Sequence, residues 1–346
     1  MSIVTNRTVK VAAVQAAPVF FDLDACLVKA KQFVDQAAAQ GCDLVAFGEA
    51  WFPGYPFQIW LGAPAWGMQF TTRFFDNSLE AGSSQFARLC ALARDANIMI
   101  SAGISERDGG SLYLSQVLIG KDGEVESLRR KLKPTHVERS VFGEGYGKDL
   151  AVTETEIGRV GQLCCWEHIQ PLSKYALFSQ NEQIHIAGWP AFTLYKGNAH
   201  ALGAEVNMAA SQVYAVEGQV FVVAATSVID KAALELFKVG EEVPPFLEEG
   251  GGSAMIFAPD GRRLAEYIPE TEEGLVVAEI NFDDITMAKS IADPAGHYAK
   301  PEATQLILDR RSVDPVVILE DEDEDEDHGQ ADSQAQHWVT DGVESE

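Results

Sequence analysis

Short apolar runs alternate with longer amphipathic segments through the first 290 residues. Residues 9–16 are rich in valine and alanine and predict a strand, whereas in residues 22–40 apolar positions recur about every 3.6 residues and predict a helix. The same criteria predict further strands at 43–47, 98–104, 159–164, 183–187, 220–225, 253–257 and 274–280, and further helices at 83–96, 170–180 and 204–217.

One hairpin interrupts this alternation. Residues 112–119 and 124–130 are two predicted strands that flank the turn sequence Lys121-Asp122-Gly123. A hairpin combined with strand–helix units predicts an α/β sandwich with a mixed sheet rather than a purely parallel one. Residues 1–290 show no linker and no internal repeat, so we expect them to form one domain.

The C-terminal residues differ in composition from the rest of the chain. Pro294, Pro301 and Pro315 interrupt regular structure, so we expect residues 291–319 to form an extended arm. Eight consecutive acidic residues, Glu320 to Asp327, begin a tail that holds 12 acidic residues and no lysine or arginine. Such a segment cannot bury a core, and we expect the tail 320–346 to be disordered.

The overall charge argues against nucleic-acid binding. The chain has 52 acidic and 26 basic residues, a net charge of −26, and no basic stripe. No apolar run reaches the roughly 18 residues of a membrane span, and the N-terminus lacks the apolar region of a secretory signal. These features predict a cytoplasmic protein without nucleic-acid or membrane partners.

Sequence patterns typical of metal and nucleotide sites do not occur. There is no HExxH, CxxC pair or phosphate-binding lysine loop, and the glycines of Gly143-Glu144-Gly145-Tyr146-Gly147 have the wrong spacing for dinucleotide binding. The five cysteines are not spaced as a disulfide framework, so we expect free thiols. We predict no metal and no cofactor.

Three chemically useful residues stand at the ends of predicted strands. Glu49 follows the strand 43–47, Lys131 ends the second hairpin strand, and Cys165 follows the strand 159–164. A thiol beside a helix N-terminus is accessible and its thiolate is stabilised. Each residue also has a structural interpretation, respectively a capping carboxylate, a solvated basic face and a core thiol. We assign that last interpretation to Cys164, which faces away from Cys165.

Taken together with their neighbours, these three residues resemble the Glu-Lys-Cys triad of the nitrilase superfamily. The similarity covers roughly residues 8–300, and Glu138 corresponds to a second carboxylate of the site. Residues 11–18 and 170–176 are most similar to bacterial arylacetonitrilases. The stretches that resemble the nitrilase branch are Phe52-Pro53-Gly54-Tyr55-Pro56, Arg130-Lys131-Leu132-Lys133-Pro134-Thr135-His136-Val137-Glu138-Arg139 and Cys165-Trp166-Glu167-His168.

The resemblance implies a carbon-nitrogen hydrolase fold, an α-β-β-α sandwich whose dimer forms four layers. It also implies a homodimer as building block and higher oligomers or helical filaments, with residues 56–75 and 229–252 as insertions. The substrate would be a small organic nitrile. A slot for an aryl or arylacetyl group would be lined by aromatic residues near the motifs, namely Tyr55, Trp60, Trp166, Trp189 and Phe192.

The implied activity is hydrolysis of the nitrile to a carboxylic acid and ammonia through a cysteine thioimidate and thioester. Cys165 would be the nucleophile, held as a thiolate by Lys131, and Glu49 the general base. Two alternatives stay open: hydrolysis of an aliphatic amide or N-carbamoyl compound, and a catalytically silent, filament-forming homologue. Gly48 replaces the proline that much of the superfamily has at this point, and we expect it to loosen the backbone before Glu49.

Overall fold

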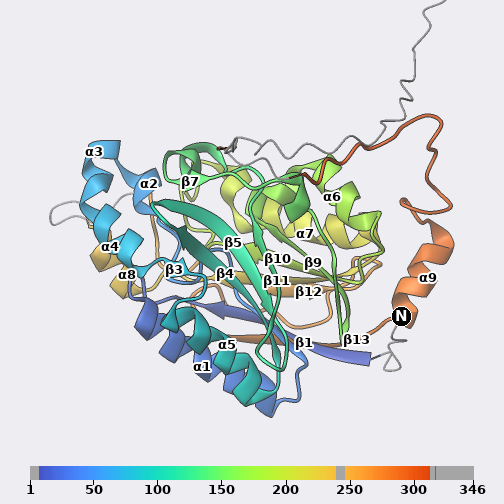
Figure 1. Ribbon diagram of the computed structural model, residues 1–346, viewed down its shortest axis with the longest axis horizontal. Coiled ribbons are helices and arrows are strands. Elements are labelled where there is room, and N and C mark those ends of the chain that lie inside the picture. The colour runs from blue at the N-terminus through green and yellow to red at the C-terminus, as the bar shows by residue number, and fades with distance from the viewer. Residues whose placement is uncertain (1–7, 239–245, 312–315, 317–346) are drawn as a thin grey trace, which may run out of the picture. The chain divides into compact units, whose positions relative to one another are not determined.

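Two β-sheets lie face to face at the centre of the fold, and helices cover both outer sides (Figure 1). The computed structural model describes residues 8–238, 246–311 and 316. The first sheet runs in the order β6 (Val125–Arg130), β5 (Ser111–Ile119), β4 (Met99–Asp108), β2 (Leu44–Ala46) and β1 (Thr8–Ala16), and β13 (Gly274–Asn281) pairs with β1. The second runs β11 (Phe221–Ser227), β10 (Ile184–Trp189), β9 (Gly158–Cys164) and β8 (Thr153–Thr155), and β12 (Met255–Phe257) pairs with β11.

The two sheets are hydrogen-bonded to each other at one end. There the last residues of β1 pair in parallel with β11, through Gln15 with Thr226 and Ala16 with Ser227. Two short strands, β3 (Leu79–Glu80) and β7 (Phe142–Gly143), pair in parallel with one end of β4 and of β5, respectively. Because parallel strands from both sheets end near this junction, the residues that follow them are brought together.

Alternation along the strands creates three apolar layers. In β1, Val11 and Ala13 point between the sheets, whereas Ala12 and Val14 pack against the helices α1 (Leu23–Ala39) and α5 (Ser84–Ala96). In β11, likewise, Val223 points between the sheets, while the neighbouring side chains pack against α6 (Pro171–Phe178) and α7 (Ala204–Gly218). This arrangement confirms the predicted α-β-β-α sandwich.

A separate, largely aromatic cluster lies beside the sheets, and residues 56–75 contribute Phe57, Leu61, Phe70 and Phe74 to it. That segment forms α2 (Gln58–Leu61), α3 (Pro64–Gly67), the 3₁₀ helix η1 (Met68–Phe70) and the start of α4 (Thr71–Asn77). The cluster joins it to the end of α8 (Lys231–Leu236) through Phe21, Phe57, Phe74 and Phe237. The segment is therefore anchored to the sandwich.

The chain divides into two units near its C-terminal end. The chain through Ser312 belongs to one compact unit, and a second begins at Val313, of which the structure describes only the exposed Val316. Residues 292–311 contain no helix or strand, and Leu306 and Leu308 pack against the core that underlies α6 and α7. The predicted acidic tail 320–346 lies outside the described residues, and the division into domain 1–290 and arm 291–319 stays a prediction.

Most predicted elements are present. The predicted strands and long helices agree with the structure to within a few residues. The elements that were not predicted are β3, β7, β8, α8, α9 (Asp283–Ile291) and the short helices of residues 56–75. A five-residue 3₁₀ helix, η4 (Cys165–Ile169), precedes α6. In the part of the chain that the structure describes, no helix has the length and apolarity needed to cross a membrane.

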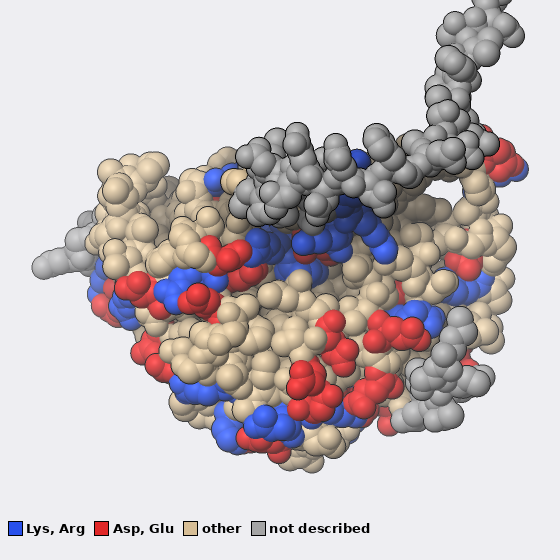
Figure 2. All heavy atoms as spheres, viewed as in Figure 1, with Lys and Arg blue, Asp and Glu red and all other residues tan. Residues whose placement is uncertain are grey.

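Acidic and basic side chains are mixed on the surface. Many exposed basic groups are paired, as in Lys31–Asp35 and Arg88–Asp24. Figure 2 shows the same mixing of the two charges over one face. The absence of a nucleic-acid partner stays a prediction of the sequence.

Candidate active site

Glu49 lies where β2 ends, at the junction of the two sheets. Its backbone N–H donates to the carbonyl of Trp189, the last residue of β10, at 3.1 Å. Gly48 is packed tightly here, because a Cβ atom on it would lie 2.6 Å from the Trp189 carbonyl oxygen and 3.2 Å from the backbone nitrogen of Ser227. The expectation that Gly48 loosens the backbone is therefore wrong: its missing side chain permits a close, fixed approach of three strand ends.

Lys131 connects two carboxylates inside the protein. It follows β6, and its ammonium donates to Glu49 Oε1 and to Glu138 Oε2, both at 2.8 Å. The side chains of Lys131 and Glu49 are fully buried and that of Glu138 almost so. Buried charges persist only when paired and hydrogen-bonded, and here one cation is shared by two acids.

Glu138 is held at the start of a 3₁₀ helix, η2 (His136–Ser140). The backbone N–H of Thr135 donates to Glu138 Oε2, and the Tyr55 hydroxyl donates to Glu138 Oε1 at 2.7 Å. The indole of Trp60 in turn donates to the Tyr55 oxygen at 2.9 Å. A hydrogen-bonded path thus runs from Trp60, in the 56–75 segment, to Glu138 and Lys131.

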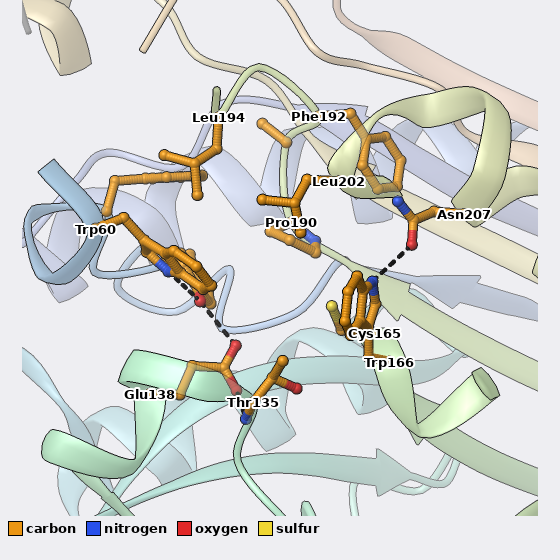
Figure 3. Close-up of a pocket in the computed structure, with 13 residues that line it drawn as sticks. Trp60, Thr135, Glu138, Cys165, Trp166, Pro190, Phe192, Leu194, Leu202 and Asn207 are labelled. Atoms are coloured by element: carbon orange, nitrogen blue, oxygen red, sulfur yellow. Dashed lines mark hydrogen bonds between the residues drawn. The ribbon is translucent and has the colours of Figure 1, made fainter. Parts of the chain in front are cut away.

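Cys165 follows β9 at a sharp turn of the chain. Its φ is +46°, a left-handed conformation that costs about 1–2 kcal/mol for a residue with a side chain. Cys165 and Glu138 line the same pocket, and Figure 3 shows the sulfur atom and the carboxyl group facing one space. The structure therefore brings Cys165, Glu138, Lys131 and Glu49 into one neighbourhood.

The pocket beside Cys165 is mainly apolar and aromatic (Figure 3). Four of the five predicted substrate-binding residues line it, and the exception is Trp189, which is fully buried behind the pocket and donates to Ser211. Trp166 donates to the amide oxygen of Asn207 at 3.0 Å, which fixes the indole. The lining residues are Tyr55, Phe57, Trp60, Thr135, Glu138, Cys165, Trp166, Pro190, Ala191, Phe192, Leu194, Leu202 and Asn207.

Comparison with known families agrees with this geometry. The sequence profile described as carbon-nitrogen hydrolase matches residues 10–290. The chain belongs to the carbon-nitrogen hydrolase family. Within that family it is a member of the nitrilase branch, as its relatives of known function make clear.

Two of those relatives and one solved structure show how similar this chain is to known proteins. The chain is 56% identical to an arylacetone-specific nitrilase of Alcaligenes faecalis, over 90% of this chain and 88% of that protein. It is 48% identical to an aliphatic nitrilase of Rhodococcus rhodochrous, over 90% and 85% of the two chains. A mutant amidase of Nesterenkonia sp. AN1 with acrylamide has the same fold, with a TM-score of 0.61, 18% identity and coverage of 82% and 94%.

The charges of this carbon-nitrogen hydrolase site strongly affect its titration. Burial raises the pKa of Glu49 to about 7, opposed by Lys131 and assisted by Glu138. Burial likewise raises the pKa of the Cys165 thiol well above its usual value, and the negative charge of Glu49 adds to this effect. These effects favour the neutral thiol, whereas the sequence analysis expected a thiolate held by the Lys131 ammonium.

One oxygen of Glu49 has no partner. Oε1 accepts from Lys131, whereas Oε2 is buried and has no hydrogen-bond partner among the described residues. A buried carboxylate oxygen without a partner is costly, and such atoms occur where a proton or a ligand is to be received. With a pKa near neutrality, Glu49 is suited to take a proton at this atom.

A second buried ion pair links the segments that carry Cys165 and Lys131, and sequence reasoning missed it. Arg129 donates to both oxygens of Glu167, at 2.9 and 2.7 Å, and the same carboxylate accepts the backbone N–H groups of Cys164 and Leu132 at 2.8 Å. Burial opposes the ionisation of Glu167, yet Arg129 and these N–H groups lower its pKa overall. The sequence shows both residues, each two positions from a motif residue, but it does not show that they pair.

The other predictions about this site concern metals and thiols. Among the residues that the structure describes, no group of three histidine, cysteine or acidic side chains could hold a metal ion. The described cysteines are all free thiols, and Cys164 is fully buried. That position agrees with the structural interpretation given to Cys164.

Proposed function

We propose that this carbon-nitrogen hydrolase converts an organic nitrile, an arylacetonitrile or a related compound, to the carboxylic acid and ammonia. The observation that carries the proposal is Lys131, buried between Glu49 and Glu138 beside the pocket that Cys165 lines. The curated relatives are nitrilases and arylacetonitrilases, at identities of up to 56%. No metal or organic cofactor is required for this chemistry.

The first step makes the nucleophile. The neutral Cys165 thiol gives its proton to Glu49, whose free Oε2 can receive it, and the sulfur attacks the nitrile carbon. A carbon–sulfur bond forms, one carbon–nitrogen π bond breaks, and the nitrogen takes up the proton. The product is a thioimidate, and Lys131 stabilises the negative charge that develops on the nitrogen.

The following steps add two molecules of water. The first adds to the thioimidate carbon to give a tetrahedral species, which expels ammonia and leaves a thioester. The second hydrolyses the thioester to the acid and restores the Cys165 thiol. Expulsion of the sulfur instead of ammonia would release an amide, so a minor amide product is expected. Glu49 and Glu138 share the proton transfers, and the Lys131 ammonium is hydrogen-bonded to both.

The pocket supports an aromatic or branched substrate more than a short, polar one. Trp60, Trp166 and Phe192 supply flat apolar surface close to Cys165. The amidase alternative is less well supported, because the curated relatives are nitrilases and the amidase resemblance is one of fold alone. The relatives include aliphatic nitrilases, which keeps the aliphatic nitriles in the test panel.

We also propose assembly into a homodimer and higher oligomers. The outer face of α6 and α7 exposes Leu172, Val213 and Val216, an unusual apolar content for a free helical face. Sedimentation velocity on the full chain tests this proposal, and a monomer at all concentrations would contradict it. The cytoplasmic location stays a prediction of the sequence.

The activity is tested by ammonia release from phenylacetonitrile, mandelonitrile, an aliphatic dinitrile and phenylacetamide. We expect release from the nitriles, with the acid as main product, and its loss in Cys165→Ala. Cys90→Ala, at a partly exposed thiol of α5, is the matched control and should keep full activity. Release from the amide alone favours the amidase alternative, no release favours the silent homologue, and an active Cys165→Ala refutes the mechanism.

A further inference from the structure

Behind the pocket, a chain of buried titratable groups ends at the carbonyl of Cys165. His168 Nδ1 lies 2.6 Å from the Cys165 carbonyl oxygen, and His168 Nε2 lies 2.9 Å from His185 Nε2. His185 Nδ1 lies 2.7 Å from Glu182 Oε1, and the Tyr214 hydroxyl donates to Glu182 Oε2 at 2.7 Å. The reaction proposed above uses none of these four side chains.

The chain is built into the core with little freedom. His185 stacks on Tyr214 with ring centroids 3.7 Å apart, and His168 stacks on Trp189 at 4.9 Å. Gly161 of β9 makes room for the acid, because a Cβ atom at this position would overlap with the carboxyl group of Glu182. All four polar side chains are buried, and their hydrogen bonds are made to one another and to the Cys165 carbonyl.

The Cys165 carbonyl fixes the direction of the two hydrogen bonds that neutral His168 makes. A carbonyl oxygen only accepts, so His168 must carry its proton on Nδ1. Neutral His168 then accepts on Nε2, which requires a proton on His185 Nε2. Neutral His185 in turn accepts on Nδ1, which requires that Glu182 is protonated. The equivalent arrangement places the same proton on His185 and leaves Glu182 ionised.

We propose that His168, His185 and Glu182 are positioning residues that hold the Cys165 backbone for catalysis, and that they do so only while Glu182 and His185 share one proton. The proposal rests on the proposed role of Cys165 as nucleophile. The left-handed conformation of Cys165 is unfavourable by itself, so it must be maintained by its surroundings. The His168–carbonyl hydrogen bond is the contact that these residues supply to it.

Removal of the shared proton breaks one hydrogen bond of the chain, either at Glu182 or at the Cys165 carbonyl. If the rings keep their protons, the Glu182 carboxylate faces a lone pair on His185 Nδ1 at 2.7 Å. If His185 turns its proton toward Glu182, His168 must move its own proton to Nε2. A lone pair on His168 Nδ1 then faces the Cys165 carbonyl oxygen at 2.6 Å. Either way, one hydrogen bond of the chain is lost.

Neighbouring charges favour the neutral arrangement. Burial lowers the pKa of both histidines, and burial raises the pKa of Glu182 to about 8, although the Tyr214 hydrogen bond partly opposes it. The charged groups that act on the histidines are the Arg129–Glu167 pair and Lys174 of α6. The shared proton therefore belongs to Glu182 at neutral pH and is lost above about pH 8.

The test compares Glu182→Gln with Glu182→Met over the pH range 6 to about 10. Glutamine keeps a donor for His185 and an acceptor for Tyr214 at every pH, whereas methionine fills the same space with neither. We expect the glutamine variant to keep kcat within about threefold of the wild type at pH 7. We also expect its kcat not to decrease at alkaline pH as that of the wild type does. The methionine variant should lose about tenfold or more in kcat, with KM little changed.

Three outcomes overturn the proposal. The first is a methionine variant with the kcat of the wild type, and the second is a glutamine variant whose kcat is as low as that of the methionine variant. The third is a glutamine variant whose kcat decreases at the same alkaline pH as that of the wild type. Should the methionine variant fail to fold by circular dichroism, the pH profile of the glutamine variant still decides. Glu205→Gln, at an exposed acid of α7, is the matched control and should reproduce the wild-type profile. The Cys165→Ala variant tests the role of Cys165 as nucleophile independently. If it is inactive while one of the three outcomes above is found, only the proposal about the positioning residues fails.

Discussion

Glu49 gives one carboxylate oxygen to Lys131, at 2.8 Å from Nζ, and keeps the other, Oε2, without a hydrogen-bond partner in the described part of the chain. One oxygen of Glu49 thus holds the side chain in place, and the other can take part in proton transfer. The ammonium fixes the direction of the carboxyl group, and the second oxygen can accept the proton of a thiol or of water. The arrangement separates positioning from proton transfer within one side chain.

Replacement of Glu49 by glutamine removes the base but keeps its shape. We expect kcat/KM to fall by a factor of about 10² to 10⁴, the usual contribution of a positioned general base. Ammonia release with phenylacetonitrile measures the loss, and circular dichroism checks the fold. Activity within a few-fold of the wild type would show that another group takes the proton.

The pH dependence of kcat/KM follows from the raised pKa of Glu49. A base works in its deprotonated form, so activity is lost as the pH falls through about 7, not through the ordinary glutamate range near 4.5. A pH–rate profile from pH 5 to about 8 measures the midpoint. An acid limb centred below about pH 5 would contradict the assignment to Glu49.

Loss of the Lys131 charge should affect stability as well as activity. Lys131→Met leaves two buried carboxylates without their cation, and breaking such a buried pair costs about 3–5 kcal/mol of unfolding free energy. Urea titration measures the cost. The double variant Lys131→Met with Glu138→Gln removes one of the two acids, and we expect it to recover stability but not activity. Equal stability of the single and double variants would argue against charge as the cause.

The buried pair of Arg129 and Glu167 predicts a second stability effect. Glu167→Gln leaves Arg129 buried without its counter-ion and should cost about 3–5 kcal/mol. The pKa of Glu167 is lowered, so its contribution is present above the ordinary glutamate range and is lost as the pH falls through the lower folded value. Asp35→Asn, in an exposed pair with Lys31, is the control and should change stability by less than about 1 kcal/mol.

Gly48 should tolerate no side chain. Gly48→Ala places a Cβ atom against backbone of β10 and β11, and we expect a loss of about 1–3 kcal/mol in stability together with a lower kcat, because Glu49 is displaced. Gly110→Ala is the matched control, since a Cβ atom there meets nothing within 4 Å. A fully active, stable Gly48→Ala variant would contradict this reading of the strand junction.

The regular part of the fold was predictable because its signals are local. The two periods, two for strands and 3.6 for helices, identify β1 and α1 from a few residues each. The four-residue helices α2 and α3 have no such period, since their positions depend on the aromatic cluster around Phe57 and Phe237. Patterns shorter than about two turns carry little information on secondary structure.

For the site, too, local sequence identified some features, and others depend on the folded chain. Glu49, Lys131, Cys165 and Glu138 were named because their neighbours resemble known motifs, which fixes the residues but not their protonation. The neutral state of Cys165 depends on burial, a property of the folded chain. The bond from Arg129 to Glu167 and the bond between the rings of His168 and His185 join different segments, and nothing in the sequence shows those partners.

Trp60 forms part of the pocket wall and also donates to the Tyr55 hydroxyl, which donates to Glu138. Engineering this position to admit bulkier nitriles would therefore alter turnover chemistry along with substrate size, because the replacement also removes a donor that polarises the phenol. Directed-evolution libraries are better built by varying Trp60 and Tyr55 jointly. Selection can then find a larger cavity together with a new hydrogen bond to Glu138.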